Sequence, residues 1–483
     1  MRRNEKTKVL YIVALLVVYA MGAAGYLLVK LPWYDALYYA AQLFFLNYYD
    51  VESGNLLLYV GRVLCPIMTA AGLAALVRNF YKLVLDYMMS KSKKATALYY
   101  DSAQMKKIGE NFKRPVYMEK KPNKYAKSHV FLLTNDIDNL KLYDEMKHVL
   151  AEGSKVYIEL EEMDSKLLAK SNVVFFNTNE IIARKYWRER NLIKFLVDGK
   201  LAVKIAIIGF GSLGKNILNY GLTNNIYSLN QSIEYHVWGN GNLHSNMLGG
   251  FDKMNGDTIT YHGVDWKEDI LQLKEFDRII VTREPNIELL QALLYLNSDA
   301  EIDFYNPMDN KLGEIYEEKT LTPFGQLREI LTEENIKTDK LYRDAKELNY
   351  NYAVVYDTDG SYTWDCPDVV DKIEKKWNEL NNFKKGSNVA GADYQPIREM
   401  VAQALGMNRN NLSSEQLEVL KEMEHIRWCR YHFVNHWQYA KERNDQKKKH
   451  PLLVPYSELS KAEGDKDAEV IQLLFGVRVK ENM

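Results

Sequence analysis

Two long apolar segments near the N-terminus constrain this chain more than any other feature. Residues 9–29 contain no charged side chain, and residues 56–77 contain one, Arg62. At about 1.5 Å per helical residue, each segment covers about 30 Å, the thickness of the hydrocarbon core of a bilayer. We therefore predict two transmembrane helices. A signal peptide is the alternative for the first segment, but the run is too long and no A-x-A-like cleavage site follows it before Trp33.

Basic residues set the orientation of this hairpin. They precede the first segment and follow the second, whereas the loop of residues 31–55 carries mainly acidic charge. The positive-inside rule then places both ends of the hairpin in the cytoplasm and the loop outside. About 400 mostly polar residues follow, enough for two or three domains. We divide the chain into a cytoplasmic N-terminus (1–8), a two-span module (9–77), a connector (78–96), two α/β units (97–200 and 201–318), a helical linker region (319–410) and a C-terminal domain (411–483).

Composition excludes some classes of protein. The net charge is −1 and the pI is about 6.8, which argues against a nucleic-acid-binding protein. Cys65, Cys366 and Cys429 have neither metal-ligand spacing nor a pairing pattern. They fit a reducing cytosol, and no metal site is predicted.

The loop between the two spans has the pattern of a pore module. Residues 35–46 have helical spacing, begin with Asp35-Ala36-Leu37-Tyr38-Tyr39 and lead into Asn47-Tyr48-Tyr49-Asp50. This order resembles two-span potassium channels, in which D-A-x-Y-F precedes a T-x-G-Y-G-D filter. Here the filter position has no glycine, so potassium selectivity is not expected. The candidate pore residues are Asn47, Tyr48, Tyr49, Asp50 and Arg62.

Two interpretations of this hairpin remain open. The loop either lines a pore or only packs against the two helices. Arg62 either faces a water-filled lumen or extends to the outer interface, since a charged side chain in the membrane is costly.

Strands and helices alternate after residue 96, which predicts parallel sheets covered by helices. In the second unit, a strand runs into the sequence GFGSLG at 209–214 and then into a helix. Gly209, Gly211 and Gly214 match the dinucleotide turn, whose glycines let the backbone approach a pyrophosphate at a helix N-terminus. The next strand, 233–238, is followed by Gly239-Asn240-Gly241, without the acid that holds a ribose hydroxyl. A structural role is therefore favoured over NAD binding.

We find no catalytic arrangement of side chains beside this motif and predict that the chain is not an enzyme. A two-span module followed by two such α/β units resembles channels with RCK domains, the regulators of potassium conductance. Residues 9–307 carry this resemblance. It implies Rossmann-like units that assemble into a ring and pull on the pore helices when a ligand binds.

The C-terminal end holds the most specific sequence pattern. It contains E-H-x-R-W at Glu424–Trp428, W-x-Y at residues 437–439, and HPLLVPY at residues 450–456. These pieces resemble the RyR domain, the repeat named from ryanodine receptors, although His436 stands where that family usually has glycine.

The same segment has the chemistry of a small-ligand site. Aromatic faces stack on purines, and arginines donate to phosphates. The candidate ligand-binding residues are Arg427, Trp428, Arg430, Trp437, Tyr439, Arg443, His450 and Tyr456. The alternative is that the aromatic residues form the core of the domain and the lysines at 447–449 form a solvated loop.

Together these features predict an α/β chain with a membrane pore module, acting as a homotetramer in the bacterial inner membrane with its large soluble part in the cytoplasm. The RyR domain would sense a nucleotide-type signal, cyclic or derived from ADP-ribose, and the RCK-like ring would open the pore to ions. Such combinations resemble antiphage effectors of nucleotide signalling systems. The alternatives are an RCK-regulated potassium channel or transporter subunit, a membrane-tethered NAD-binding oxidoreductase, and a membrane-anchored scaffold.

Overall fold

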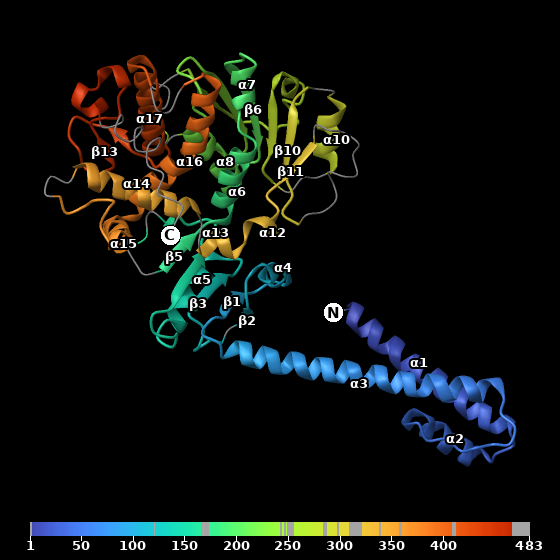
Figure 1. The fold of residues 1–483 in the computed structure, drawn as a ribbon. Coiled ribbons are helices and arrows are strands. Elements are labelled where there is room, and N and C mark those ends of the chain that lie inside the picture. The colour runs from blue at the N-terminus through green and yellow to red at the C-terminus, as the bar shows by residue number, and fades with distance from the viewer. Residues whose placement is uncertain are drawn as a thin grey trace. The chain divides into compact units, whose positions relative to one another are not determined.

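The computed structural model describes residues 2–465 (Figure 1), except 120, 166–167, 169–172, 242–243, 246–247, 249–255, 284–286, 297–298, 309–320, 338–339, 357–359 and 408–411. The chain separates into two compact units, Met1–Ser92 and Lys93–Met483. The first unit is helical and the second is α/β. This division agrees with the predicted fold class.

The first unit holds three helices and one short 3-10 turn: α1 (Arg2–Leu28), α2 (Trp33–Gln42), η1 (Leu43–Phe45) and α3 (Leu56–Ser90). By length and composition, Val9–Leu28 and α3 are apolar enough to span a membrane. Asn55 caps α3, because its side-chain oxygen accepts the Leu58 N–H at 3.0 Å. The helix continues through Pro66 and past the predicted end of the second span, so it is longer than the sequence indicated.

Glycines let α1 and α3 approach closely. A Cβ added to Gly25 would lie 2.7 Å from the Leu58 nitrogen, and one added to Gly61 would lie 3.2 Å from the Gly22 Cα. Small residues at such crossings are how apolar helices pack without a hydrophobic driving force. The side chains buried between the helices include Tyr26, Leu43 and Leu58.

The first sheet of the α/β unit has five parallel strands in the order β2-β1-β3-β4-β5. Its elements are β1 (Thr96–Tyr100), α4 (Ala103–Ile108), η2 (Gly109–Asn111), β2 (Pro115–Met118), β3 (Ser128–Leu132), α5 (Asp136–Met146), β4 (Lys155–Glu159), β5 (Val173–Phe176), α6 (Thr178–Glu189) and α7 (Ile193–Val197). This is the strand order of flavodoxin-like sheets.

The second sheet has six parallel strands in the order β11-β10-β9-β6-β7-β8. Its elements are β6 (Ala202–Ile208), α8 (Ser212–Asn224), β7 (Ser232–Trp238), β8 (Thr258–His262), η5 (Gln272–Glu275), β9 (Arg278–Val281), α10 (Ile287–Tyr295), β10 (Glu301–Tyr305) and β11 (Leu321–Phe324). Numbered within the unit, this is the 3-2-1-4-5-6 order of dinucleotide-binding folds. The glycine turn leaves β6 where the order reverses.

Strand β11 corrects one expectation. Residues 319–410 were expected to be helical, but Leu321–Phe324 pairs in parallel with β10, with Leu321 opposite Ile302. Pro323 does not prevent this pairing, because β11 is the edge strand and has one neighbour. A second strand that the sequence analysis missed, β8, lies at the opposite edge of the sheet.

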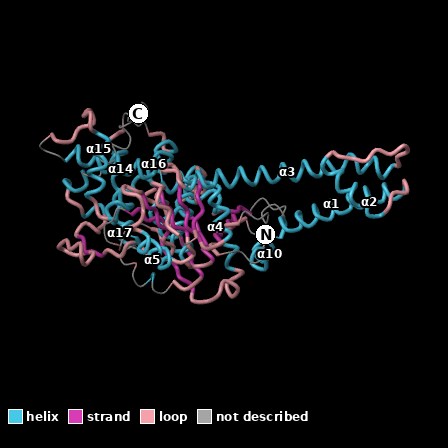
Figure 2. The backbone as a smooth tube through the Cα atoms, turned by 90° about the horizontal axis from the view of Figure 1, so that it is seen from below, coloured by secondary structure: helices cyan, strands magenta, loops and turns pink. Residues whose placement is uncertain are grey.

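The remaining elements are mainly helices: α12 (Leu327–Ile330), α13 (Glu333–Lys337), α14 (Lys340–Tyr356), α15 (Val369–Glu379), α16 (Asn382–Ala404), α17 (Ser414–Val434) and η6 (Tyr456–Glu458), with short paired strands β12 (Gln438–Tyr439) and β13 (Lys449–His450). In Figures 1 and 2, α14 lies beside both α15 and α16. Helix α17 packs on α8, and Leu222, Val401 and Phe433 share one buried cluster. The C-terminal domain therefore shares its core with the α/β body.

Candidate functional site

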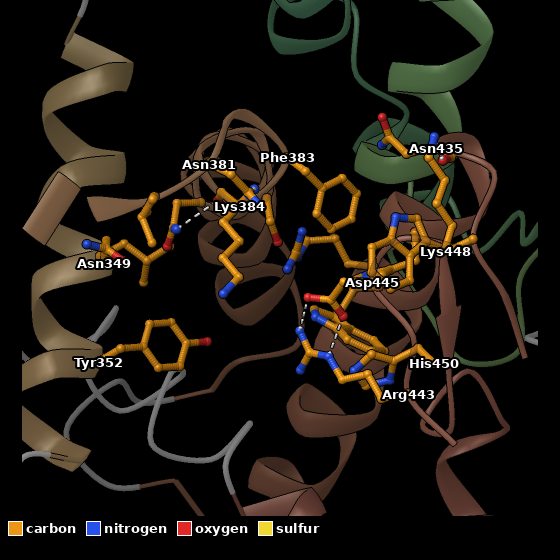
Figure 3. A pocket seen from close by; sticks show the side chains of 18 of the residues that line it. Asn349, Tyr352, Asn381, Phe383, Lys384, Asn435, Arg443, Asp445, Lys448 and His450 are labelled. Carbon is orange, nitrogen blue, oxygen red and sulfur yellow. Dashed lines mark hydrogen bonds and ion pairs between the residues drawn. The ribbon is translucent and has the colours of Figure 1, made fainter. Parts of the chain in front are cut away.

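One cavity in the described part of the chain lies where the C-terminal domain meets the helices before it. It has a volume of about 470 Å³. Helix α14, the start of α16, helix α17 and the segment of residues 437–450 form its walls (Figure 3). Asp164, which follows β4 in the first sheet, also lines it. Segments far apart in the sequence therefore build one site, of a size typical for small-molecule pockets.

Local sequence positions these elements. Helix α17 begins with a capping box, in which Ser413 and Gln416 satisfy each other's backbone N–H groups. Helix α16 begins at Asn381, whose side chain accepts the Lys384 N–H at 2.9 Å. Both caps fix where a helix starts. They therefore also fix which side chains of its first turns reach the cavity.

One wall of the cavity is aromatic. The ring centroids of Phe383 and Trp437 are 4.9 Å apart and nearly parallel, and the His432 ring lies 3.9 Å from Trp428. His450 lies 5.0 Å from Trp428. The Trp437 indole Nε1 is buried and has no hydrogen-bond partner among the described residues. This wall offers flat surfaces and a buried donor.

Both histidines of this wall are neutral at physiological pH. Burial lowers the pKa of His432 to about 3 and that of His450 to about 4. A neutral imidazole keeps one donor and one acceptor nitrogen. In His432 the Nδ1 atom lies 2.8 Å from the Trp428 carbonyl oxygen. The histidines therefore contribute rings and hydrogen bonds, and the positive charge comes from other residues.

Cationic side chains stand around the aromatic wall. Lys384 extends into the cavity from α16, and Arg443 forms a bidentate pair with Asp445 (Figure 3). Lys448 Nζ donates to the Asn435 carbonyl at 3.0 Å. Tyr352 of α14 enters from the opposite side of the cavity. Aromatic surface beside cations is the combination that binds a base together with phosphate.

Arg427 connects the cavity to the interior. Its Nε lies 3.0 Å from both Glu424 oxygens, and its Nη2 lies 2.7 Å from Oε1. Arg398 of α16 donates to the same carboxylate. The two guanidinium groups outweigh burial and keep the pKa of Glu424 below its usual value. The cavity floor is therefore a buried charge cluster that joins α16 to α17.

Five of the eight predicted ligand residues line the cavity: Arg427, Trp428, Trp437, Arg443 and His450. Arg430 lies elsewhere, fully buried, with Nη2 2.6 Å from Asp257 and Nη1 2.9 Å from the Leu222 oxygen. Tyr439 is exposed on β12, and the Tyr456 hydroxyl donates to Glu418 at 2.9 Å. These three residues do not line the cavity, although Tyr439 pairs with His450 between β12 and β13.

Sequence reasoning missed the half of the cavity that precedes the C-terminal domain. Tyr352, Asn381, Phe383 and Lys384 line it, all from the stretch interpreted as a linker. Their helices were expected, but nothing in the sequence around them marks a ligand site. Only the packing of α14 on α16, and of α16 on α17, identifies these residues.

The glycine turn is also well defined. Gly209 has a φ of +102°, and a Cβ added to Gly214 would lie 2.1 Å from the Gly209 oxygen. A Cβ added to Gly211 meets no described atom within 4 Å. Two of the glycines thus serve the fold, and only the position of Gly211 is open.

Neighbouring groups fill the space around this turn. The Phe210 nitrogen lies 2.8 Å from where a Cβ on Gly239 would be, at the end of β7. The Phe210 ring packs edge-on against His244 and Tyr261. At the N-terminus of α8, Ser212 Oγ donates to the Glu161 oxygen at 2.8 Å. These contacts tie the turn to β7, to β8 and to the segment that follows β4.

In the first unit, Arg62 binds the loop between the helices. Its Nη2 donates to the Tyr49 carbonyl at 3.1 Å, and its guanidinium lies 4.6 Å from the centre of the Tyr48 ring. The Tyr49 N–H lies 3.2 Å from the Tyr26 hydroxyl. Asn47 and Asp50 are exposed within the unit. The Tyr49 carbonyl is therefore engaged by a side chain.

In the described part of the chain, no group of three or more His, Cys, Asp or Glu residues is arranged to hold a metal ion.

Comparison with known proteins identifies the C-terminal domain. Residues 407–477 match the family model of the RyR domain, which confirms the resemblance drawn from the C-terminal motifs. No curated protein and no solved structure matches the chain.

Proposed function

We propose that this chain is the subunit of a ligand-gated membrane pore whose RyR domain senses a nucleotide-type signal. The observation that carries the proposal is the cavity between α14, α16 and α17, with its aromatic wall and its cations. The two apolar helices of the first unit support a membrane location.

The chemistry of the cavity favours a phosphorylated ring compound. Base–aromatic stacking contributes about 1–3 kcal/mol per base, and this wall presents Phe383, Trp428 and Trp437. Lys384 and Arg443 supply charge for phosphate groups. Because the two histidines are neutral, they suit contacts to a base or ribose better than ion pairing.

The position of the cavity supports coupling to the rest of the chain. Asn382 Nδ2 donates to the Ser165 oxygen at 3.0 Å and the Leu168 oxygen at 3.1 Å, beside Asp164 in the β4–β5 connection. A ligand in the cavity would touch both the RyR domain and the first sheet. In the chain, α3 leads through residues 91–95 to β1, the first strand of that sheet. We propose that an RCK-like ring of these units transmits the change to α3.

The pore would be weakly selective. No glycine lies between Leu46 and Asp50, and Arg62 engages the Tyr49 carbonyl, which a carbonyl filter would leave for ions. Asp50 and Glu52 near the outer mouth favour cations by charge. These features disfavour the alternative of a potassium channel. The absence from the sequence of an acidic residue directly after β7 and of a catalytic arrangement beside the turn disfavours the NAD-binding oxidoreductase.

For the biological role, we propose a homotetramer in the bacterial inner membrane that opens in response to a cyclic or ADP-ribose-derived nucleotide. Opening would permeabilise the membrane and stop growth, as an antiphage response requires.

Vesicle flux tests the proposal directly. The purified full chain is reconstituted into lipid vesicles that contain a small fluorescent dye, and a panel of cyclic and ADP-ribose-derived nucleotides is added. We expect one member to trigger release from wild-type vesicles and not from Arg443→Ala vesicles. If a nucleotide binds the protein without causing flux, the pore is wrong. If release occurs equally without any nucleotide, the sensor is wrong.

A further inference from the structure

Residues 437–450 form a loop that lines the cavity. Among the described residues of this loop, Arg443 and Asp445 form the only ion pair between two of its side chains. Arg443 Nε lies 2.7 Å from Oδ1 and Nη2 lies 3.2 Å from Oδ2, with about half of each side chain exposed. Both residues line the cavity and flank Asn444. In Figure 3 the pair projects into the cavity and not away from it. Two parallel N–H···O bonds are also the geometry in which arginine holds a phosphate.

A second cation faces the same carboxylate. Lys384 comes from α16, a different element, and points into the cavity toward the pair (Figure 3). Arg443 and Lys384 both lower the pKa of the Asp445 carboxyl, with Arg443 as the larger cause. Arg443 thus contacts the carboxylate directly, and Lys384 acts on it through its charge from a separate element.

The backbone around this pair is held in place. Asn444 and Lys449 exchange two backbone hydrogen bonds, each 2.9 Å long. The Lys447 N–H donates to the Asn444 side chain at 3.0 Å. Because these bonds involve Asn444 and not the Asp445 side chain, the carboxylate can rotate away from Arg443 without unfolding the loop.

We propose that Arg443 and Lys384 form the phosphate subsite of the cavity, and that Asp445 occupies this subsite as an internal competitor until a ligand displaces it. This inference rests on the proposed function. It names the part of the ligand that the site selects and the residue that sets the threshold for binding.

The charges predict the class of ligand. Arg443 and Lys384 carry two positive charges against the single charge of Asp445. A singly charged group, such as a cyclic phosphodiester, would only replace the carboxylate. A terminal phosphate or a diphosphate brings two or more negative charges and neutralises both cations. The site therefore selects a nucleotide with a diphosphate or a free phosphate monoester over a cyclic mononucleotide.

The test compares Asp445→Asn with Glu442→Gln, each of which removes one negative charge from the same loop. Glu442 is exposed and lies outside the cavity, so it controls for the change in overall charge. Binding of inorganic pyrophosphate to the full chain is followed by the fluorescence of Trp428 and Trp437, which line the cavity. We expect Asp445→Asn to bind pyrophosphate about two- to fivefold more tightly than wild type, since exposed ion pairs compete at about that level. Glu442→Gln should match wild type.

Each outcome decides the matter. The inference is overturned if Asp445→Asn and wild type bind pyrophosphate equally, or if Glu442→Gln tightens binding as much as Asp445→Asn does. It is also overturned if Asp445→Asn does not bind pyrophosphate at millimolar concentration. If Asp445→Asn binds pyrophosphate more tightly while no nucleotide binds the wild type, the phosphate subsite stands and the nucleotide sensor fails. Where both bind, AMP should bind wild type more tightly than cyclic AMP, and the opposite preference would overturn the predicted class of ligand.

Discussion

The glycine turn at 209–214 and the cavity of the RyR domain are two candidate ligand sites that differ in how far a sequence motif marks them. The turn has a clear motif on a sheet with the strand order of dinucleotide-binding folds, yet the backbone itself requires Gly209 and Gly214, and no acid directly follows β7. Half of the cavity lies outside any motif, yet aromatic rings and cations from several elements surround about 470 Å³ of space. A local motif records a backbone geometry, whereas a ligand site also requires room that only tertiary packing creates.

The largest expected effect separates structure from ligand binding within α17. Arg430 and Asp257 are both fully buried and paired at 2.6 Å. Removing one partner leaves an uncompensated buried charge, so Arg430→Ala should lower the free energy of unfolding by about 3–5 kcal/mol. Arg443→Ala, at a half-exposed position, should change it by about 0.5 kcal/mol or less. Urea unfolding of the full chain in detergent measures both. A stable Arg430→Ala protein that has lost nucleotide binding would show that Arg430 belongs to the ligand site after all.

The second effect tests which glycines the turn requires. A Cβ at position 214 would lie 2.1 Å from the Gly209 oxygen and 2.9 Å from Thr282 Oγ1. Gly214→Ala should therefore destabilise the fold by about 1–3 kcal/mol, the cost of overpacking. Gly211→Ala adds its Cβ where no described atom lies within 4 Å and should be nearly neutral. Thermal unfolding compares them, and an equal loss in both variants would show that the turn is packed differently.

The third effect is a pH dependence of the aromatic wall. Burial, with a smaller contribution from the Arg443 charge, lowers the pKa of His450 to about 4, which is below its value in the unfolded chain. Asp445 and Glu463 act in the opposite direction. The folded state thus binds fewer protons, and the stability it contributes is present above about pH 6.5 and lost as pH falls toward 4. Between pH 7 and 5 this residue should account for about 1–2 kcal/mol.

His450→Gln tests this by removing the titrating group. Its free energy of unfolding should fall less than that of wild type between pH 7 and 5, although His432 keeps part of the slope. Identical slopes in the two proteins would mean that His450 is solvated.

The sequence predicted most of the fold for physical reasons that are local. The long apolar segments, the buried strands such as Ala202–Ile208 and the RyR motifs each follow from composition over a short window. The two strands of the α/β sheets that it missed, β8 and β11, lie at the edges of the second sheet, where Thr258–His262 is only partly buried and Leu321–Phe324 carries a proline. Neither stretch has the continuous buried, proline-free run that marks a central strand. The two-residue strands β12 and β13 were also not predicted.

The candidate site was only partly predictable. Trp428, Trp437, Arg443 and His450 stand in a recognisable segment, and residue type alone marked them as suited to a ligand. The same reasoning included Arg430, because an arginine paired with a distant Asp257 looks identical in sequence to one that faces a cavity. Tyr352, Phe383 and Lys384 were missed, since their role depends on how α14 packs on α16 and α16 on α17.

The central claim is that the signal binds in the cavity and not at the glycine turn. Calorimetry on the full chain with a panel of cyclic and ADP-ribose-derived nucleotides tests it most directly, using Arg443→Ala and Gly211→Val as the paired variants. Losing a charge-assisted hydrogen bond costs about 1.5–3 kcal/mol, so Arg443→Ala should weaken binding about tenfold or more. Gly211→Val should bind as wild type does. The reverse result, with binding lost in Gly211→Val and kept in Arg443→Ala, would contradict the account and make the glycine turn the sensor.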